Sequence, residues 1–217
     1  SRPRRAPQRS DDVAGTGAPG LAAQKKSLRA SDQDATARAA WREELAACDP
    51  AHLVFVDESG THTALTRLRA RAPRGQRAIG RAPRNHGPNL TLFAALTPQG
   101  MGPALVVEGG ADHAACATYI TQALVPSLRP GQVVIMDRLN VHTGASIRAS
   151  IEAAGCELRL LPAYSPDFNP IEQAFAKIKT HLRSAEARTF PALVRAIGIA
   201  LDRITPADAC HCYTHCG

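Results

Sequence analysis

Short apolar runs bounded by turn residues alternate with amphipathic segments along the chain. Runs rich in β-branched residues and leucine predict strands at residues 53–56, 89–96, 104–109, 133–136 and 157–161. Apolar residues at helical spacing predict helices over residues 32–47, 112–126 and 144–154, then from 170, over 190–204, and from 206. About three strands that can pair antiparallel precede an alternation of helix and strand. This order predicts an α/β fold with a mixed five-stranded sheet and helices on its faces.

The helix that follows the last strand has the strongest start signal. Asn169 is a favoured N-cap, Pro170 suits the first helical position, and Glu172 falls in the first turn. The residues spaced to form its apolar face are Ile171, Ala174, Phe175, Ile178 and Leu182. On this stretch alone, Glu172 can be the carboxylate of a capping box. A catalytic role needs partner carboxylates elsewhere in the chain.

Composition divides the chain into three parts. Residues 1–30 mix Arg, Pro, Gly, Ser and Ala without a hydrophobic period, which indicates a disordered leader or a linker remnant. Residues 31–50 are expected to form a linker helix with Ser31 as its N-cap, and residues 51–217 the main domain. No apolar run indicates a signal peptide or a membrane span, so a cytoplasmic location is expected. The scattered cysteines 48, 116 and 156 suit reduced thiols.

The charge of the chain points to a polyanionic partner. The formal net charge is +7, although only four of the 26 basic residues are lysines, a bias that a GC-rich genome also produces. Residues 66–84 contain seven arginines and no acid, which is plausible for a phosphate-binding track and also for a solvated arginine-rich hairpin. The candidate DNA contacts in this run are Arg67, Arg69, Arg74, Arg77, Arg81 and Arg84.

Three acids stand at the ends of predicted elements. Asp57 follows one strand directly, Asp137 follows another, and Glu172 opens the helix after the last strand. If the two strands are neighbours, both aspartates lie at one edge of the sheet, where the helix can bring Glu172. Carboxylate oxygens gathered in this way suit Mg²⁺, and a pair of such ions supports phosphoryl transfer. An aspartate that merely ends a strand is the common alternative for each residue taken singly.

The segments VFVDES, IMDRLNVH and LPAYSPDFNPIEQAFAKIK contain these acids, and together they resemble the catalytic blocks of mariner-type bacterial insertion-sequence transposases. That family belongs to the DDE superfamily and has an RNase H-like fold. The resemblance runs from about Lys26 to the C-terminus. It implies that Asp57, Asp137 and Glu172 are the catalytic, metal-binding triad, with Mg²⁺ or Mn²⁺ as cofactor.

The resemblance also implies partners. The substrate is expected to be double-stranded DNA, at the element ends and at the target, bound by a homodimer. Lys179 and Arg183, on the face of Glu172, are expected to point toward DNA phosphates. His142 is expected either to contact DNA or the scissile phosphate or to be an ordinary turn histidine. Family members carry helix-turn-helix modules before the catalytic domain. Residues 1–30 are too short to supply them, so a separate N-terminal half is a further expected partner.

The chain departs from the family pattern at several positions. Arg138 replaces the asparagine that follows the second aspartate, next to the expected metals. Thr143 replaces a lysine, while Ala163 and Phe168 replace a proline and a leucine in the third block. Two alternatives to an active transposase therefore stay open. One is a catalytically inactive remnant that binds DNA or a partner chain, and the other is an RNase H-like nuclease without strand joining.

The C-terminal segment CHCYTHCG is a cluster of cysteine and histidine. Structural zinc sites usually combine two pairs of ligands separated by a loop, and one cluster is present here. Opportunistic metal binding or chance is therefore preferred to a structural zinc site.

Overall fold

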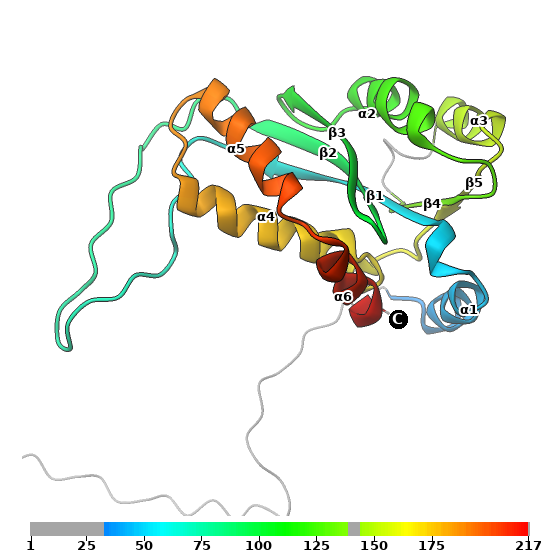
Figure 1. Cartoon of the computed structure of the whole chain (residues 1–217), viewed down its shortest axis with the longest axis horizontal. Coiled ribbons are helices and arrows are strands. Elements are labelled where there is room, and N and C mark those ends of the chain that lie inside the picture. The colour runs from blue at the N-terminus through cyan, green and yellow to red at the C-terminus, as the bar shows by residue number, and fades with distance from the viewer. Residues whose placement is uncertain (1–32, 139–143, 217) are drawn as a thin grey trace, which may run out of the picture. The chain divides into compact units, whose positions relative to one another are not determined.

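A five-stranded mixed sheet forms the centre of the computed structural model, which describes residues 33–138 and 144–216 (Figure 1). The leader expected over residues 1–30, with Ser31, lies outside the described residues. The strand order is β3-β2-β1-β4-β5. The strands are β1 (Leu53–Thr61), β2 (Leu90–Thr97), β3 (Gly100–Glu108), β4 (Val133–Met136) and β5 (Glu157–Leu160). β1, β2 and β3 pair antiparallel, whereas β4 and β5 run parallel to β1, which confirms the predicted mixed sheet.

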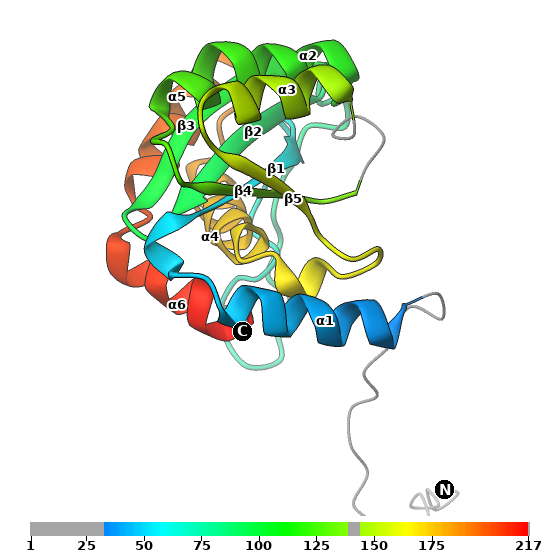
Figure 2. The ribbon, with the colours of Figure 1, turned by 90° about the vertical axis from the view of Figure 1, so that its right-hand side faces the viewer.

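Helices cover both faces of the sheet because side chains alternate along its strands. In β1, Leu53 and Phe55 enter one core, and Val54 and Val56 enter the other. The first core is closed by α1 (Ala35–Ala46), α4 (Ile171–Ala185), α5 (Phe190–Asp202) and α6 (Pro206–Cys216). The second is closed by α2 (His113–Tyr119) and α3 (Ala145–Ala153) (Figures 1 and 2). None of the helices among the described residues is long and apolar enough to span a membrane.

Several predicted boundaries are wrong for identifiable reasons. β1 continues to Thr61 because the residues after Val56 pair with β2. The expected helix over residues 112–126 is α-helical only to Tyr119 and then passes through a π-helical turn (Ile120–Leu124) and a 3-10 turn (Val125–Ser127). α1 begins at Ala35 with the Asp34 side chain as its cap, so the prediction of Ser31 as N-cap is wrong.

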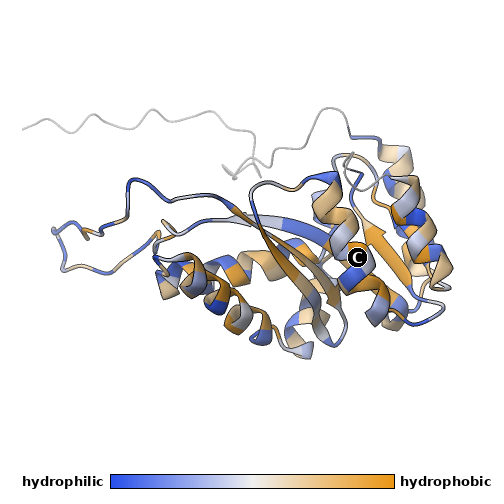
Figure 3. Ribbon diagram, turned by 90° about the horizontal axis from the view of Figure 1, so that it is seen from above, coloured by the Kyte–Doolittle hydropathy of each residue, from blue (hydrophilic) through white to orange (hydrophobic). Residues whose placement is uncertain are grey.

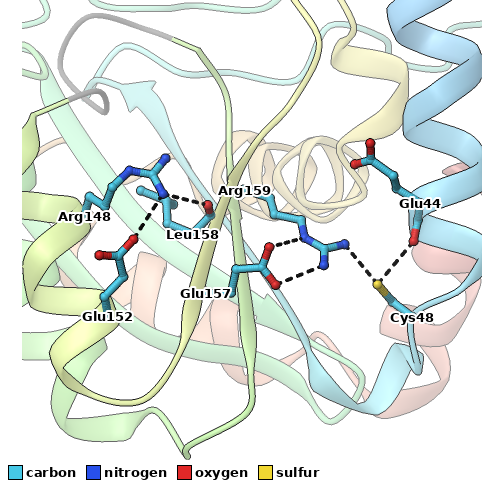
Figure 4. Close-up of polar contacts among 7 residues, drawn as sticks. All are labelled: Glu44, Cys48, Arg148, Glu152, Glu157, Leu158 and Arg159. Atoms are coloured by element: carbon cyan, nitrogen blue, oxygen red, sulfur yellow. Dashed lines mark hydrogen bonds and ion pairs between the residues drawn. The ribbon is translucent and has the colours of Figure 1, made fainter.

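The helix expected as a linker packs onto the main domain. Trp41 of α1 is buried in the first core. Arg159 of β5 pairs with Glu157 at 2.7 Å and donates to Sγ of Cys48 at 3.1 Å, just beyond the end of α1 (Figure 4). The contact between Arg159 and Cys48 joins the end of α1 to the edge strand β5. Cys48, Cys116 and Cys156 are free thiols in the structure.

Candidate active site

Two of the expected acids lie side by side on neighbouring parallel strands. Val56 of β1 pairs with Met136, the last residue of β4, so Asp57 and Asp137 are the next residues on adjacent strands. The Asp57 side chain is buried, with 7% of the residue exposed, and Asp137 is half-buried. The sheet register therefore brings these two carboxylates to one edge.

The third acid arrives through the connection between β5 and α4. The Leu161 N–H donates to the Met136 carbonyl at 2.8 Å, which keeps the chain beside the end of β4. The chain then passes through a 3-10 turn (Pro166–Phe168) into the first turn of α4, where Glu172 is exposed. Asp57, Asp137 and Glu172 line one cavity of about 370 Å³, and the β5–α4 connection and Arg138 form the rest of its wall.

Burial and neighbouring acids both disfavour the charged form of Asp57. Burial raises the pKa of the Asp57 carboxyl from its ordinary value of 3.8 to about 8. The negative charges of Glu58, Asp137 and Glu172 act in the same direction, while the Glu58 N–H, 2.8 Å from Asp57 Oδ1, opposes the shift. A buried carboxylate among like charges is stabilised by a cation. The site is therefore suited to a positively charged ligand.

Asn169 contacts the buried acid directly. Its Nδ2 donates to Oδ2 of Asp57 at 2.8 Å, and the residue is 3% exposed. The prediction that Asn169 is the N-cap of α4 is wrong, because no side chain caps that helix. Asn169 Oδ1 is buried and has no hydrogen-bond partner among the described residues. The sequence contained the signal in its Asn-Pro-Ile-Glu step, but a local interpretation assigned it to helix capping.

The β5–α4 connection contains a strained residue and is contacted by Gln33, just before α1, and by Arg38 of α1. Tyr164 has a φ of 55°, a left-handed conformation that is rare for a bulky residue, and its carbonyl accepts from Gln33 Nε2 at 2.6 Å. Arg38 donates to Asp167 Oδ1 at 3.0 Å, and its guanidinium lies 4.1 Å from the centre of the Phe168 ring. Figure 2 shows α1 beside this connection. Phe168, which departs from the family pattern, thus provides an aromatic face for an arginine.

The chemistry of the three acids suits a divalent cation, although their side chains are spread around the cavity. Three carboxylates supply the hard oxygen ligands that Mg²⁺ and Mn²⁺ prefer. Asn169 lines the same cavity, and its Oδ1 has no hydrogen-bond partner among the described residues. Within the described residues, no three His, Cys, Asp or Glu side chains are close enough together to hold a metal ion. The acids thus line a common cavity without forming a closed ligand cage.

The arginine run lies in the long connection between β1 and β2. Its candidate DNA contacts, Arg67, Arg69, Arg74, Arg77, Arg81 and Arg84, are all exposed. The base of the connection is fixed: Thr63 Oγ1 donates to the His86 carbonyl at 2.6 Å, and Arg188 Nη1 donates to the carbonyls of Thr63 and Leu65 at 3.0 and 2.7 Å. Beyond that base the connection extends away from the sheet, and it is mainly hydrophilic (Figures 1 and 3).

The other two expected DNA contacts that the structure describes, Lys179 and Arg183, are less exposed than the arginine run. Lys179 of α4 is half-buried and lines a small hollow beside the end of β1, and Arg183 is half-buried one turn further along α4. His142 and Thr143 lie outside the described residues. The structure therefore places the arginine run, rather than α4, as the most exposed basic surface among the expected residues.

The C-terminal cysteine and histidine cluster forms α6. Cys212 is buried in the first core and Cys210 is exposed, so the helix directs these two thiols into different surroundings. Cys216 Sγ accepts from Gln173 Nε2 at 3.6 Å. α6 thus helps pack the start of α4.

Comparison with known proteins agrees with this architecture. Residues 52–194 match the family described as DDE superfamily endonuclease. The strand transfer complex of Mos1 is similar over 90% of this chain, with a TM-score of 0.68 and 16% identity. The catalytic domain of Mos1 mariner transposase is similar over 82% of this chain and 83% of its own, with a TM-score of 0.58 and 13% identity. No curated protein matches the sequence significantly.

These likenesses establish the fold. The mariner Mos1 paired end complex with Mg gives a TM-score of 0.66 at 15% identity, over 92% of this chain and 65% of that one. The chain spans 62% of the Mos1 chain in the strand transfer complex. The predicted RNase H-like fold, with helices on both faces of the sheet, is confirmed.

Proposed function

The chain belongs to the DDE superfamily endonucleases, and we propose that it is a transposase catalytic domain that cuts DNA strands and joins the freed 3′-hydroxyl to a target. The observation that carries this proposal is the convergence of Asp57, Asp137 and Glu172 on one cavity. These acids come from β1, from the end of β4 and from the start of α4. Such a set of oxygen ligands is suited to phosphoryl transfer.

In this proposal the three acids hold divalent cations, Mg²⁺ or Mn²⁺. When bound, such ions stabilise the attacking and leaving oxygens of an in-line displacement at phosphorus. Asp57 is a firmly held ligand, because it lies within a central strand and both of its oxygens accept hydrogen bonds. Asp137 lies beside it, and Glu172 projects from a helix start that α1 and the β5–α4 connection hold in place.

Duplex DNA is the proposed substrate, and exposed arginines bind it. The run between Arg67 and Arg84 is fully exposed, and the whole chain has a formal net charge of +7. Arginine pairs with phosphate oxygens without reading sequence, so this surface positions the duplex rather than selecting a site. Lys179, Arg183 and His142 are the further proposed contacts. The finer expectations, a homodimer on DNA and a separate helix-turn-helix half, belong to the same proposal.

The test is a strand-cleavage assay on supercoiled plasmid. The chain is incubated with Mg²⁺ or Mn²⁺, with EDTA as the control, and products are resolved for nicks and for joined ends. Metal-dependent nicks with joined products support the transposase. Nicks without joining favour a nuclease, and DNA binding without nicks at any metal concentration favours an inactive remnant.

A further inference from the structure

A hydrogen-bonded link connects two of the proposed metal ligands through Asn169. We propose that Asn169 is a positioning residue for the metal site, in that its side-chain amide fixes the orientation of the Asp57 carboxylate relative to the start of α4. This inference rests on the proposed function, because it concerns the same three acids. It assigns to Asn169 a role that is distinct from helix capping.

The backbone of Asn169 determines where α4 begins. Its N–H donates to the Pro166 carbonyl at 3.0 Å, which closes the 3-10 turn. Its carbonyl accepts from the Glu172 N–H at 3.2 Å, which opens the helix. Asn169 therefore contacts Glu172 through its main chain and Asp57 through its side chain. One residue thus relates the positions of two acids that are far apart in sequence.

The side chain restricts the rotation of the Asp57 carboxylate. Oδ1 accepts from the Glu58 N–H, and Oδ2 accepts from Asn169 Nδ2, each at 2.8 Å. A carboxylate held at both oxygens keeps one orientation, and each oxygen retains a lone pair that can bind a cation. Removing Nδ2 leaves Oδ2 without that donor. The carboxylate then has to be ordered when the metal binds, and the ordering cost weakens binding.

The surroundings of Asn169 Oδ1 argue against helix capping as the role of this side chain. A capping asparagine uses its side-chain oxygen to accept a helix N–H. Asn169 Oδ1 is instead buried, with no hydrogen-bond partner in the described part of the chain, and α4 has no side-chain cap. Burying an unpartnered acceptor is unfavourable. This arrangement favours the bond to Asp57 as the reason for an asparagine at this position.

The inference is tested by measuring Mn²⁺ affinity with electron paramagnetic resonance on the purified chain. Asn169→Ala removes the donor, and Asn169→Leu removes it while nearly preserving the volume. We expect both variants to bind Mn²⁺ about 10-fold to 100-fold more weakly, the range typical of residues that orient metal ligands. Circular dichroism should show the parent fold. Gln173→Ala is the matched control, because it removes a half-buried amide from the first turn of α4, and that amide contacts Cys216 rather than an acid.

A nicking assay across a Mn²⁺ titration gives the second readout. A positioning role predicts that the Asn169 variants need more metal yet approach the parent rate at saturation. Parent-like Mn²⁺ affinity and metal requirement in both variants would overturn the inference and leave the proposed function intact. A parent chain that binds no Mn²⁺ would overturn the proposed function, and the inference with it.

Discussion

Asp57 and Asp137 lie side by side because the residues immediately before them are paired across β1 and β4. This register places one buried and one half-buried carboxylate at the same edge of the sheet. The β5–α4 connection then brings Glu172 to the same cavity.

The buried carboxyl of Asp57 should make the stability of the metal-free protein depend on pH. Its folded pKa of about 8 lies above its ordinary value of 3.8, so the folded state binds the proton more tightly than the unfolded chain. The resulting stabilisation is fully present below about pH 4 and is lost as the pH rises toward 8. We expect the free energy of unfolding to fall in this window by up to about 1.4 kcal/mol per pH unit from this group.

Asp57→Asn isolates that contribution. In EDTA, urea unfolding at pH 8 should show the variant to be more stable than the parent, and this difference should shrink as the pH is lowered to 5. Mg²⁺ at pH 8 should stabilise the parent and leave the variant unchanged. A variant that is less stable than the parent at pH 8 without metal would contradict the claim that the charged, buried Asp57 carboxylate destabilises the fold.

The arginine run should supply nonspecific, salt-sensitive binding to DNA. Replacing Arg74, Arg77, Arg81 and Arg84 together with glutamine should weaken duplex binding measured by fluorescence anisotropy. The slope of log affinity against log salt should become shallower by up to about 3 to 4, close to one unit per lost phosphate contact. Arg195→Gln, an exposed arginine on α5, is the control. Tight, salt-insensitive binding of the parent to one sequence would contradict this account.

The Arg38 contacts should stabilise the connection that carries Glu172 to the cavity. Arg38→Ala removes an ion pair to Asp167 and a cation–π contact with Phe168. Because the Asp167 side chain is 55% exposed, we expect a loss of only about 1 kcal/mol in the free energy of unfolding measured with urea. Arg38 donates to both carboxylate oxygens of Asp167. Arg38→Lys keeps the positive charge but cannot form both bonds in this geometry, so it should recover only part of the loss.

A matched control for this variant lies on α3. Arg148 pairs with Glu152 at 3.3 Å in an exposed geometry one helical turn apart, so Glu152→Gln should cost less than about 0.5 kcal/mol. Equal losses for Arg38→Ala and Glu152→Gln would show that the link between α1 and the β5–α4 connection contributes nothing beyond an ordinary surface pair.

Arg138 should oppose metal binding, because it lines the cavity with the three acids. Like charge near a divalent ion is unfavourable, and water and salt screen it only in part. Arg138→Asn, which restores the family residue, should lower the Mg²⁺ concentration needed for half-maximal nicking, and Arg195→Asn should not. Identical metal dependence for the parent and Arg138→Asn would show that the Arg138 charge does not affect metal binding at the site.

Local patterns in the sequence predicted most of the architecture. Strand β4 was predicted with its full bounds, and the face of α4 from Ile171 to Leu182 is buried as its spacing indicated. The wrong boundary of β1 occurs where hydrogen bonding to a neighbouring strand, rather than the local sequence pattern, determines where the element ends. β1 was cut short at Asp57 because the pattern there is polar, yet these residues pair with β2.

Nonlocal contacts explain what the sequence could not provide at the site. The side chain of Asn169 has two competing uses, a helix N–H nearby and a carboxylate on a distant strand. Only the folded chain shows that it donates to Asp57. The link between Arg38 and Asp167 joins residues that are also far apart in sequence, and it was not predicted. The three acids could be identified from the sequence, whereas the hydrogen bonds and ion pairs that orient them could not be predicted from it.

Metal-dependent nicking by single-carboxylate variants tests the central claim most directly. Asp57→Asn, Asp137→Asn and Glu172→Gln are compared with the parent on supercoiled plasmid in Mn²⁺, with Asp202→Asn at the exposed end of α5 as the control. If the three acids share one catalytic site, each of their variants keeps its fold by circular dichroism and loses nicking, while the control nicks like the parent. Nicking near the parent rate by any one of the three would remove that acid from the site and contradict the account.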